Sequence, residues 1–220
     1  MLAGMPKRRA LAAGLWAALL AASLALSVLA ASHDRLPGDL SIMSWAQDRA
    51  LPGMDVSRAA RAIGSTEVVL GTGAAAAVAL WLARRRREAL LLGLGLVVLP
   101  LLQYGLKELV DRPRPSEELV DLRAGFSSPS FPSGHVMSPA LLYGFLLYLS
   151  LRTQANAWLR AAVAGVALLM LLFSGPANVY VGVHWPSDVL GGYAWGLVLL
   201  LPLLYAVEWG RLLDAGGRRC

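Results

Sequence analysis

Residues 89–107 read ALLLGLGLVVLPLLQYGLK, an apolar run with no charge until its last residue, Lys107. A helix needs roughly 20 apolar residues to cross the hydrocarbon core of a bilayer. The run therefore predicts a membrane-spanning helix whose last residue reaches the boundary with water. The whole chain has a similar character, because only 15% of its 220 residues are charged, whereas a soluble domain carries about 25%.

Six such segments predict an all-α fold: a polytopic membrane protein whose single domain, residues 1–220, is a six-transmembrane-helix bundle. The helices are expected at residues 10–32, 64–83, 89–107, 135–151, 158–176 and 187–207. The first segment also resembles a secretory signal peptide, because three cations precede it and Val28-Leu29-Ala30 lies near its end. Its length favours a retained helix, since the apolar part of a signal peptide runs about 7–15 residues.

The charge distribution predicts the orientation of the bundle. Lysine and arginine gather on the cytoplasmic side of spans. With the N-terminus inside, the inner segments hold 12 of the 20 cations but only 3 of the 14 acidic residues. We therefore expect a multi-pass protein of the cell (plasma or inner) membrane with both termini in the cytoplasm. The same asymmetry accounts for the net charge of +6 without nucleic acid as a partner.

Three polar motifs fall at helix ends on the outer face of this bundle. The first joins Lys107, at the end of the third span, to Arg114-Pro115 in the following loop. Pro113 and Pro115 cannot continue a helix, so the third helix should stop near Arg112. Two cations then lie at the membrane boundary, where they can bind an anion. Taken alone, they are equally explained as cations that extend from a helix end to water.

The second motif, Pro132-Ser133-Gly134-His135, precedes the fourth span. Ser133 suits the N-cap of that helix, and Gly134 allows close approach of the backbone to a ligand. The free N–H groups of a helix N-terminus bind anions, which would place an anion beside His135. Taken alone, the tetrapeptide is also compatible with a simple turn and an incidental histidine.

The third motif places His184 four residues before Asp188, at the start of the sixth span. Pro186 suits the first turn of a helix, and residues four apart on a helix share a face. Asp188 could then orient one imidazole nitrogen and leave the other as a nucleophile. A structural His-Asp hydrogen bond is the alternative. Together the motifs supply cations, backbone donors and an imidazole, which indicates phosphoryl transfer at a membrane surface.

The combination of these motifs resembles the three-part signature of the type 2 phosphatidic acid phosphatase superfamily, membrane lipid phosphatases whose site is related to that of vanadium haloperoxidases. The motifs that carry the resemblance are Lys107-x6-Arg114-Pro115, Pro132-Ser133-Gly134-His135 and His184-x3-Asp188. A haloperoxidase is disfavoured, because those enzymes are expected to be soluble. The resemblance implies a lipid phosphatase that needs no metal and no other cofactor.

The resemblance also implies roles for individual residues. His184 would attack phosphorus to form a phosphohistidine, and Asp188 would orient it. His135 would protonate the leaving oxygen and then activate water. The phosphate would be held by Lys107, Arg114, Ser133, Gly134 and the residue at position 178, which is Asn178.

Position 178 departs from the family pattern. The family's third motif usually begins with Ser-Arg, and here Ala177-Asn178 stand in that place. The family's arginine binds phosphate, whereas asparagine carries no charge. Either fewer cations hold the phosphate, or another arginine substitutes, with Arg112 and Arg123 as candidates, or activity is impaired.

Two functions of different kinds follow. The first is hydrolysis of a lipid phosphate or pyrophosphate monoester, from a phospholipid or polyprenyl phosphate, at the outer or periplasmic face. The second is a catalytically impaired lipid-phosphate-binding or scaffold protein, which Asn178 favours. A transporter is disfavoured, because the polar residues cluster at one face rather than at mid-membrane. Residues 33–64 are expected to form either an amphipathic helix at the membrane surface or a loop with one short helix.

Overall fold

The structure of the protein, a computed structural model, describes residues 5–153 and 156–217. Cys220, the single cysteine, lies outside them. Within the described residues all regular structure is helical, and the chain order is α1 (Met5–Ser32), α2 (Asp39–Asp48), α3 (Met54–Ile63), α4 (Thr66–Leu82), α5 (Arg86–Val110), α6 (Gly134–Arg152), α7 (Ala157–Tyr180) and α8 (Pro186–Gly217).

The expected spans are confirmed as helices. Five of them, α1, α5, α6, α7 and α8, are long and apolar enough to cross a membrane, and α3 with α4 forms a sixth candidate span bent by 54°. Large apolar side chains face outward along these helices, such as Leu101 on α5 and Leu172 on α7. Soluble monomers rarely expose contiguous apolar surface on this scale. The chain is thus built as a multi-pass membrane protein.

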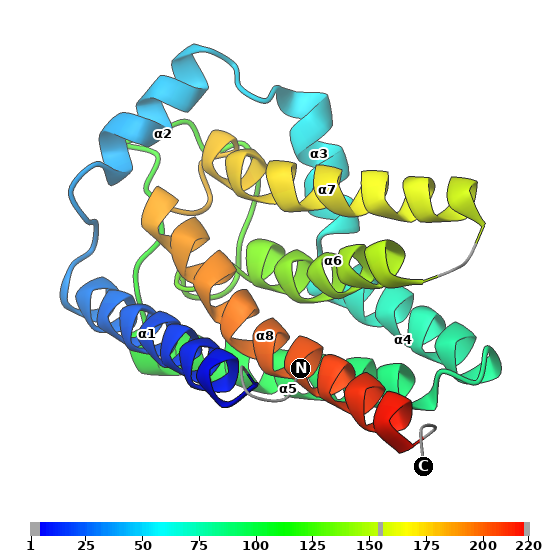
Figure 1. The fold of residues 1–220 in the computed structure, drawn as a ribbon. Helices are drawn as coiled ribbons and strands as arrows, with labels where there is room; N and C mark the ends of the chain where they lie inside the picture. Colours follow the sequence, from blue (N-terminus) through cyan, green and yellow to red (C-terminus); the bar gives the residue numbers. More distant parts are fainter. Residues whose placement is uncertain (1–4, 154–155, 218–220) are drawn as a thin grey trace.

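The bundle is organised around α6, the most buried of the spans. It packs against α7 on one side and α8 on the other, and α8 also contacts α1 and α5 (Figure 1). Glycines allow the close approach of α6 and α8: a Cβ at Gly196 would lie 2.6 Å from the Cβ of Ala140, and one at Gly144 would lie 2.4 Å from Leu200. Small residues serve in this way where helices associate in lipid.

Residues 33–64 form two helices, α2 and α3, rather than a loop with one short helix. Figure 1 shows them beside one end of the bundle, where both contact α7. On α2, Met43 is fully buried, and on α3 Ser57 and Ala60 face inward while Arg58 faces solvent. Both helices are therefore amphipathic, and their inner faces pack on protein.

The helix ends that carry the three motifs meet at this end of the bundle. Consecutive spans run antiparallel, so the C-terminal ends of α5 and α7 lie beside the N-terminal ends of α6 and α8 (Figure 1). The opposite end carries Arg85, which pairs with Glu88 at 2.9 Å, and Arg9, whose guanidinium lies 3.7 Å from the ring of Trp209. These two arginines thus lie at the end of the bundle opposite the three motifs.

One predicted helix boundary is wrong in a way that affects the site. The fifth span was expected to end at residue 176, but α7 continues through Pro176 to Tyr180. Proline is tolerated inside spanning helices when neighbouring groups compensate for the missing hydrogen bond. Asn178 consequently lies on the last turn of a helix and not in a loop.

Candidate active site

Arg114 is the residue that joins the first motif to the third. It lies in the loop after α5, and its Nη1 donates to the carbonyl of Val183 at 2.7 Å and lies 3.3 Å from Nε2 of His184. Its Nε donates to the carbonyl of Ser128 at 2.7 Å. Lys107, at the end of α5, donates to the next carbonyl along, that of Pro129, at 2.5 Å. Both cations are therefore fixed against the loop that precedes α6.

The contact with Arg114 defines the state of the His184 imidazole. A guanidinium donates hydrogen bonds and cannot accept them, so Nε2 of His184 is the acceptor and the ring proton resides on Nδ1. Nδ1 faces Oδ2 of Asp188 at 3.7 Å, which is beyond hydrogen-bond distance. Nε2 therefore carries the lone pair and is directed toward the cations of the site.

Burial keeps this imidazole neutral. His184 is almost completely buried, and the loss of water lowers its pKa to about 3. The positive charges of Arg114 and Lys107 act in the same direction, while Asp188 opposes them. A ring that stays unprotonated at neutral pH retains the lone pair that a nucleophile needs.

His184 precedes α8 instead of lying on it, because that helix begins at Pro186. A shared helix face for His184 and Asp188 required a helical turn at His184, and that condition is not met, although the two groups do face one another. Their approach comes from the turn before α8, where the N–H of Trp185 donates to Oδ2 of Asp188 at 2.8 Å.

Asp188 is fully buried and is held on both oxygens. Oδ1 accepts from Nη1 of Arg112 at 2.6 Å, and Oδ2 accepts from Ser130 and from the Trp185 N–H. A buried charge is tolerated only when it is paired and hydrogen-bonded, and these donors satisfy that requirement. They also hold Asp188 so that its carboxylate faces Nδ1 of His184.

Arg112 is a buried bridge between two carboxylates. Its guanidinium contacts Asp188 at 2.6 Å and Asp39 of α2 at 2.9 Å, and all three side chains are almost completely inaccessible. Asp39 in turn accepts from the backbone N–H and the hydroxyl of Ser187, at 2.9 and 2.7 Å. Arg112 is therefore fully engaged inside the protein, which argues against it as a substitute phosphate ligand. Asp39 was not identified from the sequence, since no local pattern links α2 to the motifs.

The second motif brings a helix N-terminus to the same place. Ser133 is the N-cap residue of α6, as expected, but its hydroxyl makes no capping hydrogen bond and has no partner among the described residues. Its backbone N–H donates to the carbonyl of Asp188 at 3.1 Å, which ties this turn to α8. His135 follows one residue after Gly134 and is half-buried, within electrostatic range of Arg114 and Lys107. The first N–H groups of α6 have no partner inside the helix.

Asn178 is fully buried and both ends of its amide are engaged. Its Nδ2 donates to the carbonyl of Ser174 at 2.7 Å, and its Oδ1 accepts from Nη1 of Arg61. Arg123, the other proposed substitute, instead donates to the carbonyl of Tyr180 and to Asp121. Arg61, on α3, was missed by the sequence analysis. It lies 117 residues from Asn178 in the chain, and no spacing rule connects them.

Among residues 5–153 and 156–217, no group of three histidine, cysteine or acidic residues has the geometry of a metal site.

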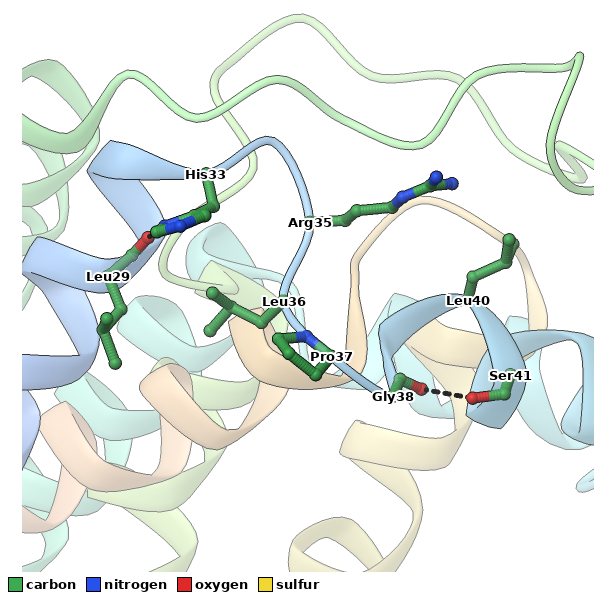
Figure 2. A pocket seen from close by; sticks show the side chains of 8 residues that line it. All are labelled: Leu29, His33, Arg35, Leu36, Pro37, Gly38, Leu40 and Ser41. Atoms are coloured by element: carbon green, nitrogen blue, oxygen red, sulfur yellow. Dashed lines mark hydrogen bonds between the residues drawn. The ribbon is translucent and has the colours of Figure 1, made fainter.

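A separate open pocket of about 770 Å³ lies between the end of α1 and the start of α2. Figure 2 shows its lining, with His33 next to Leu29 and with Leu40 and Ser41 on the first turn of α2. None of its residues belongs to the three motifs.

Comparisons with known proteins agree with this arrangement. A sequence model of the PAP2 superfamily matches residues 88–211. Phosphatidylglycerophosphatase B of Bacillus subtilis (strain 168) is 35% identical over 103 residues, which are 45% of this chain and 48% of that protein. Decaprenylphosphoryl-5-phosphoribose phosphatase of Mycobacterium tuberculosis (strain CDC 1551 / Oshkosh) is 35% identical over 121 residues, 54% of this chain and 60% of that protein. The matched part of the chain thus spans between 48% and 60% of these relatives' length.

The fold is also found in a solved structure. The crystal structure of a transmembrane PAP2 type phosphatidylglycerolphosphate phosphatase from Bacillus subtilis superposes with a TM-score of 0.72 and 25% sequence identity. The superposition covers 88% of this chain and 96% of that one. It therefore includes most of the described helices and is not limited to the three motifs.

Proposed function

The chain belongs to the PAP2 superfamily, and from this premise we propose that it hydrolyses a lipid phosphate or pyrophosphate monoester through a phosphohistidine at the outer face of the membrane. The observation that carries the proposal is the position of His184. Its Nε2 faces Arg114 at 3.3 Å and its Nδ1 faces the fixed carboxylate of Asp188. An unprotonated nitrogen next to a phosphate-binding cation is the arrangement that in-line attack on phosphorus requires.

In the first step Nε2 of His184 attacks phosphorus, a nitrogen–phosphorus bond forms, and the bond from phosphorus to the lipid oxygen breaks. His135, which enters this step protonated, donates its proton to that oxygen, so the lipid leaves as an alcohol. When the substrate is a pyrophosphate, the bond that breaks is the one to the bridging oxygen, and the lipid leaves as a monophosphate. As the imidazole acquires positive charge, the carboxylate of Asp188 stabilises it. The pair separation of 3.7 Å is expected to shorten, because catalytic hydrogen bonds often tighten only in the reacting complex.

In the second step His135 removes a proton from water, whose oxygen attacks phosphorus and displaces His184. Inorganic phosphate leaves and both histidines return to their starting states. In each step negative charge on the equatorial oxygens is met by Lys107, by Arg114 and by the first N–H groups of α6. Preorganised donors of this kind are the main catalytic resource in phosphoryl transfer.

The proposed substrate is a phospholipid or a polyprenyl phosphate in the bilayer. Two facts support it. The described chain is a membrane-embedded bundle, and its two relatives are named phosphatidylglycerophosphatase B and decaprenylphosphoryl-5-phosphoribose phosphatase. The proposed orientation, with both termini in the cytoplasm, is supported by the arginines at the end of the bundle opposite the site. A reaction at the outer or periplasmic face follows from it.

The test is phosphate release by the purified protein from a panel of lipid phosphates in the presence of EDTA. His184→Ala should reduce turnover by at least about a thousandfold, as removal of a covalent nucleophile does elsewhere. His33→Ala is the matched control, because that exposed side chain hydrogen-bonds the carbonyl of Leu29 and no other group among the described residues. Rapid quenching with a labelled substrate should trap an acid-labile phosphohistidine in the wild type alone. Full turnover in His184→Ala would exclude the mechanism.

A further inference from the structure

Arg61 lies near the site because α3 packs against α7. It lies on the last turn of α3, which packs along α7. The turn that follows is fitted closely to the start of α6: a Cβ at Gly64 would lie 3.1 Å from Pro139 and 3.3 Å from the carbonyl oxygen of His135. The end of α3 is therefore held beside the catalytic histidine of the second motif.

The Arg61 side chain is oriented by an uncharged partner. Its Nη1 donates to Oδ1 of Asn178, and the Nδ2 group of that amide is turned away by its bond to the carbonyl of Ser174 at 2.7 Å. A guanidinium has five N–H donors, and this contact uses one of them. An asparagine oxygen thus fixes the direction of the guanidinium without neutralising it.

Arg61 contrasts with Arg112, the fully buried arginine at this end of the bundle. Arg112 is paired with two carboxylates, whereas Arg61 forms no ion pair with any described residue and Asn178 is its hydrogen-bond partner. A cation withdrawn from water without a compensating anion is unfavourable. A bound anion with several acceptor oxygens would compensate it.

The charge of Arg61 reaches the other phosphate ligands. Burial is the main reason that the pKa of Arg114 falls to about 10, and the positive charge of Arg61 lowers it further while Asp188 opposes both. His135 is likewise within electrostatic range of Arg61, Arg114 and Lys107. Three cations therefore converge on the place where the phosphate is proposed to bind.

We infer that Arg61 is a phosphate-binding residue and that Asn178 positions it, so that the positive charge which family members carry at position 178 is supplied here from α3. This inference rests on the proposed phosphatase function. It reassigns Asn178 from direct phosphate ligand to positioning residue, and it removes the reason for regarding the site as impaired. Arg61 would stabilise charge on the equatorial oxygens together with Lys107 and Arg114.

The first test compares two arginines of one helix. Arg61→Ala should lower kcat/KM for a lipid phosphate by about 10²–10³, the usual cost of one preorganised donor. Arg58→Ala is the matched control, because Arg58 pairs with Asp55 at 3.8 Å on the exposed face of α3. Arg61→Lys should retain part of the activity. Equal activity of the Arg61→Ala and Arg58→Ala proteins would overturn the inference.

The second test changes the positioning residue without changing its shape. Asn178→Asp would pair with Arg61 and neutralise it, so activity should fall by at least about tenfold while the unfolding temperature is unchanged or higher. A purely structural role for the contact predicts no loss of activity in this variant. In the Arg61→Ala background, Asn178→Arg should restore activity at least about tenfold. If the folded double variant regains no activity, a cation at position 178 cannot replace the cation of Arg61, which would count against the inference.

A binding measurement separates this inference from the proposed function. Orthovanadate, a phosphate analogue, should bind the wild type and the Arg58→Ala protein alike and bind Arg61→Ala at least about tenfold more weakly, as measured by calorimetry. If the wild type hydrolyses no lipid phosphate but this difference is found, the phosphatase proposal fails and Arg61 remains an anion ligand. If the proteins bind orthovanadate equally, the assignment of Arg61 is wrong whatever the activity.

Discussion

Replacing Arg112 by methionine tests whether the buried carboxylate of Asp188 depends on its partners. Methionine preserves much of the length and apolar body of the side chain but leaves Asp39 and Asp188 without their common cation. Both ion pairs are short, at 2.9 and 2.6 Å, and the side chains involved are at most 3% exposed. The perturbation therefore removes the charge from a place that water does not reach.

The magnitude follows from that burial. Removing one partner of a buried ion pair costs about 3–5 kcal/mol, because the remaining charge stays unpaired. Natural domains are stable by only about 5–15 kcal/mol, so this loss is a large fraction of the total. In a protein of this size it corresponds to a decrease in Tm of roughly 6–20 °C. Turnover should also collapse, since Asp188 would no longer be held toward His184.

The assay is thermal unfolding of the detergent-solubilised protein, followed by tryptophan fluorescence. Arg49→Met is the matched control: its guanidinium lies over the ring of Trp45 on the surface of α2, and such changes stay within about 0.5 kcal/mol. On an Asp39→Asn background, Arg112→Met should cost less, because only one carboxylate is then left unpaired. An unchanged Tm in Arg112→Met, or strictly additive effects in the double variant, would refute this account of the network.

Two further predictions concern pH and topology. The pKa of His184 is lowered from 6.5 to about 3, so as the pH falls below about 6.5 the unfolded state takes up a proton that the folded state does not. The free energy of unfolding should therefore decrease by up to about 1.4 kcal/mol per pH unit toward pH 4. In unfolding experiments between pH 7 and 4, His184→Gln should show a correspondingly flatter profile. In intact cells an impermeant thiol reagent should miss Cys220 and label it after lysis, whereas a cysteine introduced at Glu117 on a Cys220→Ser background should be labelled from outside. The reverse labelling pattern would contradict the proposed orientation.

The sequence by itself determined the spans, because the length and polarity of an apolar run are local properties. All six segments proved helical, and the boundary near Lys107 was placed within three residues of the end of α5 at Val110. Antiparallel order then determines which helix ends share a face, and this alone brings His135, Arg114 and Asp188 to the same end of the bundle. The family was recognised from the same short motifs, whose residues are close in the chain.

Only the tertiary structure decided which partner each charged side chain pairs with. Arg112 and Arg123 were reasonable candidates for the missing cation because they lie near the motifs in sequence, yet Arg112 is paired with Asp39 and Asp188 inside the protein. Arg61 lies in a segment whose mixed composition indicated either an amphipathic helix at the membrane surface or a loop with one short helix. Its contact with Asn178 depends on α7 continuing past Pro176 and on α3 packing along it. Such pairings are set by how helices distant in the chain approach in space, and that information is not contained in residue spacing or periodicity.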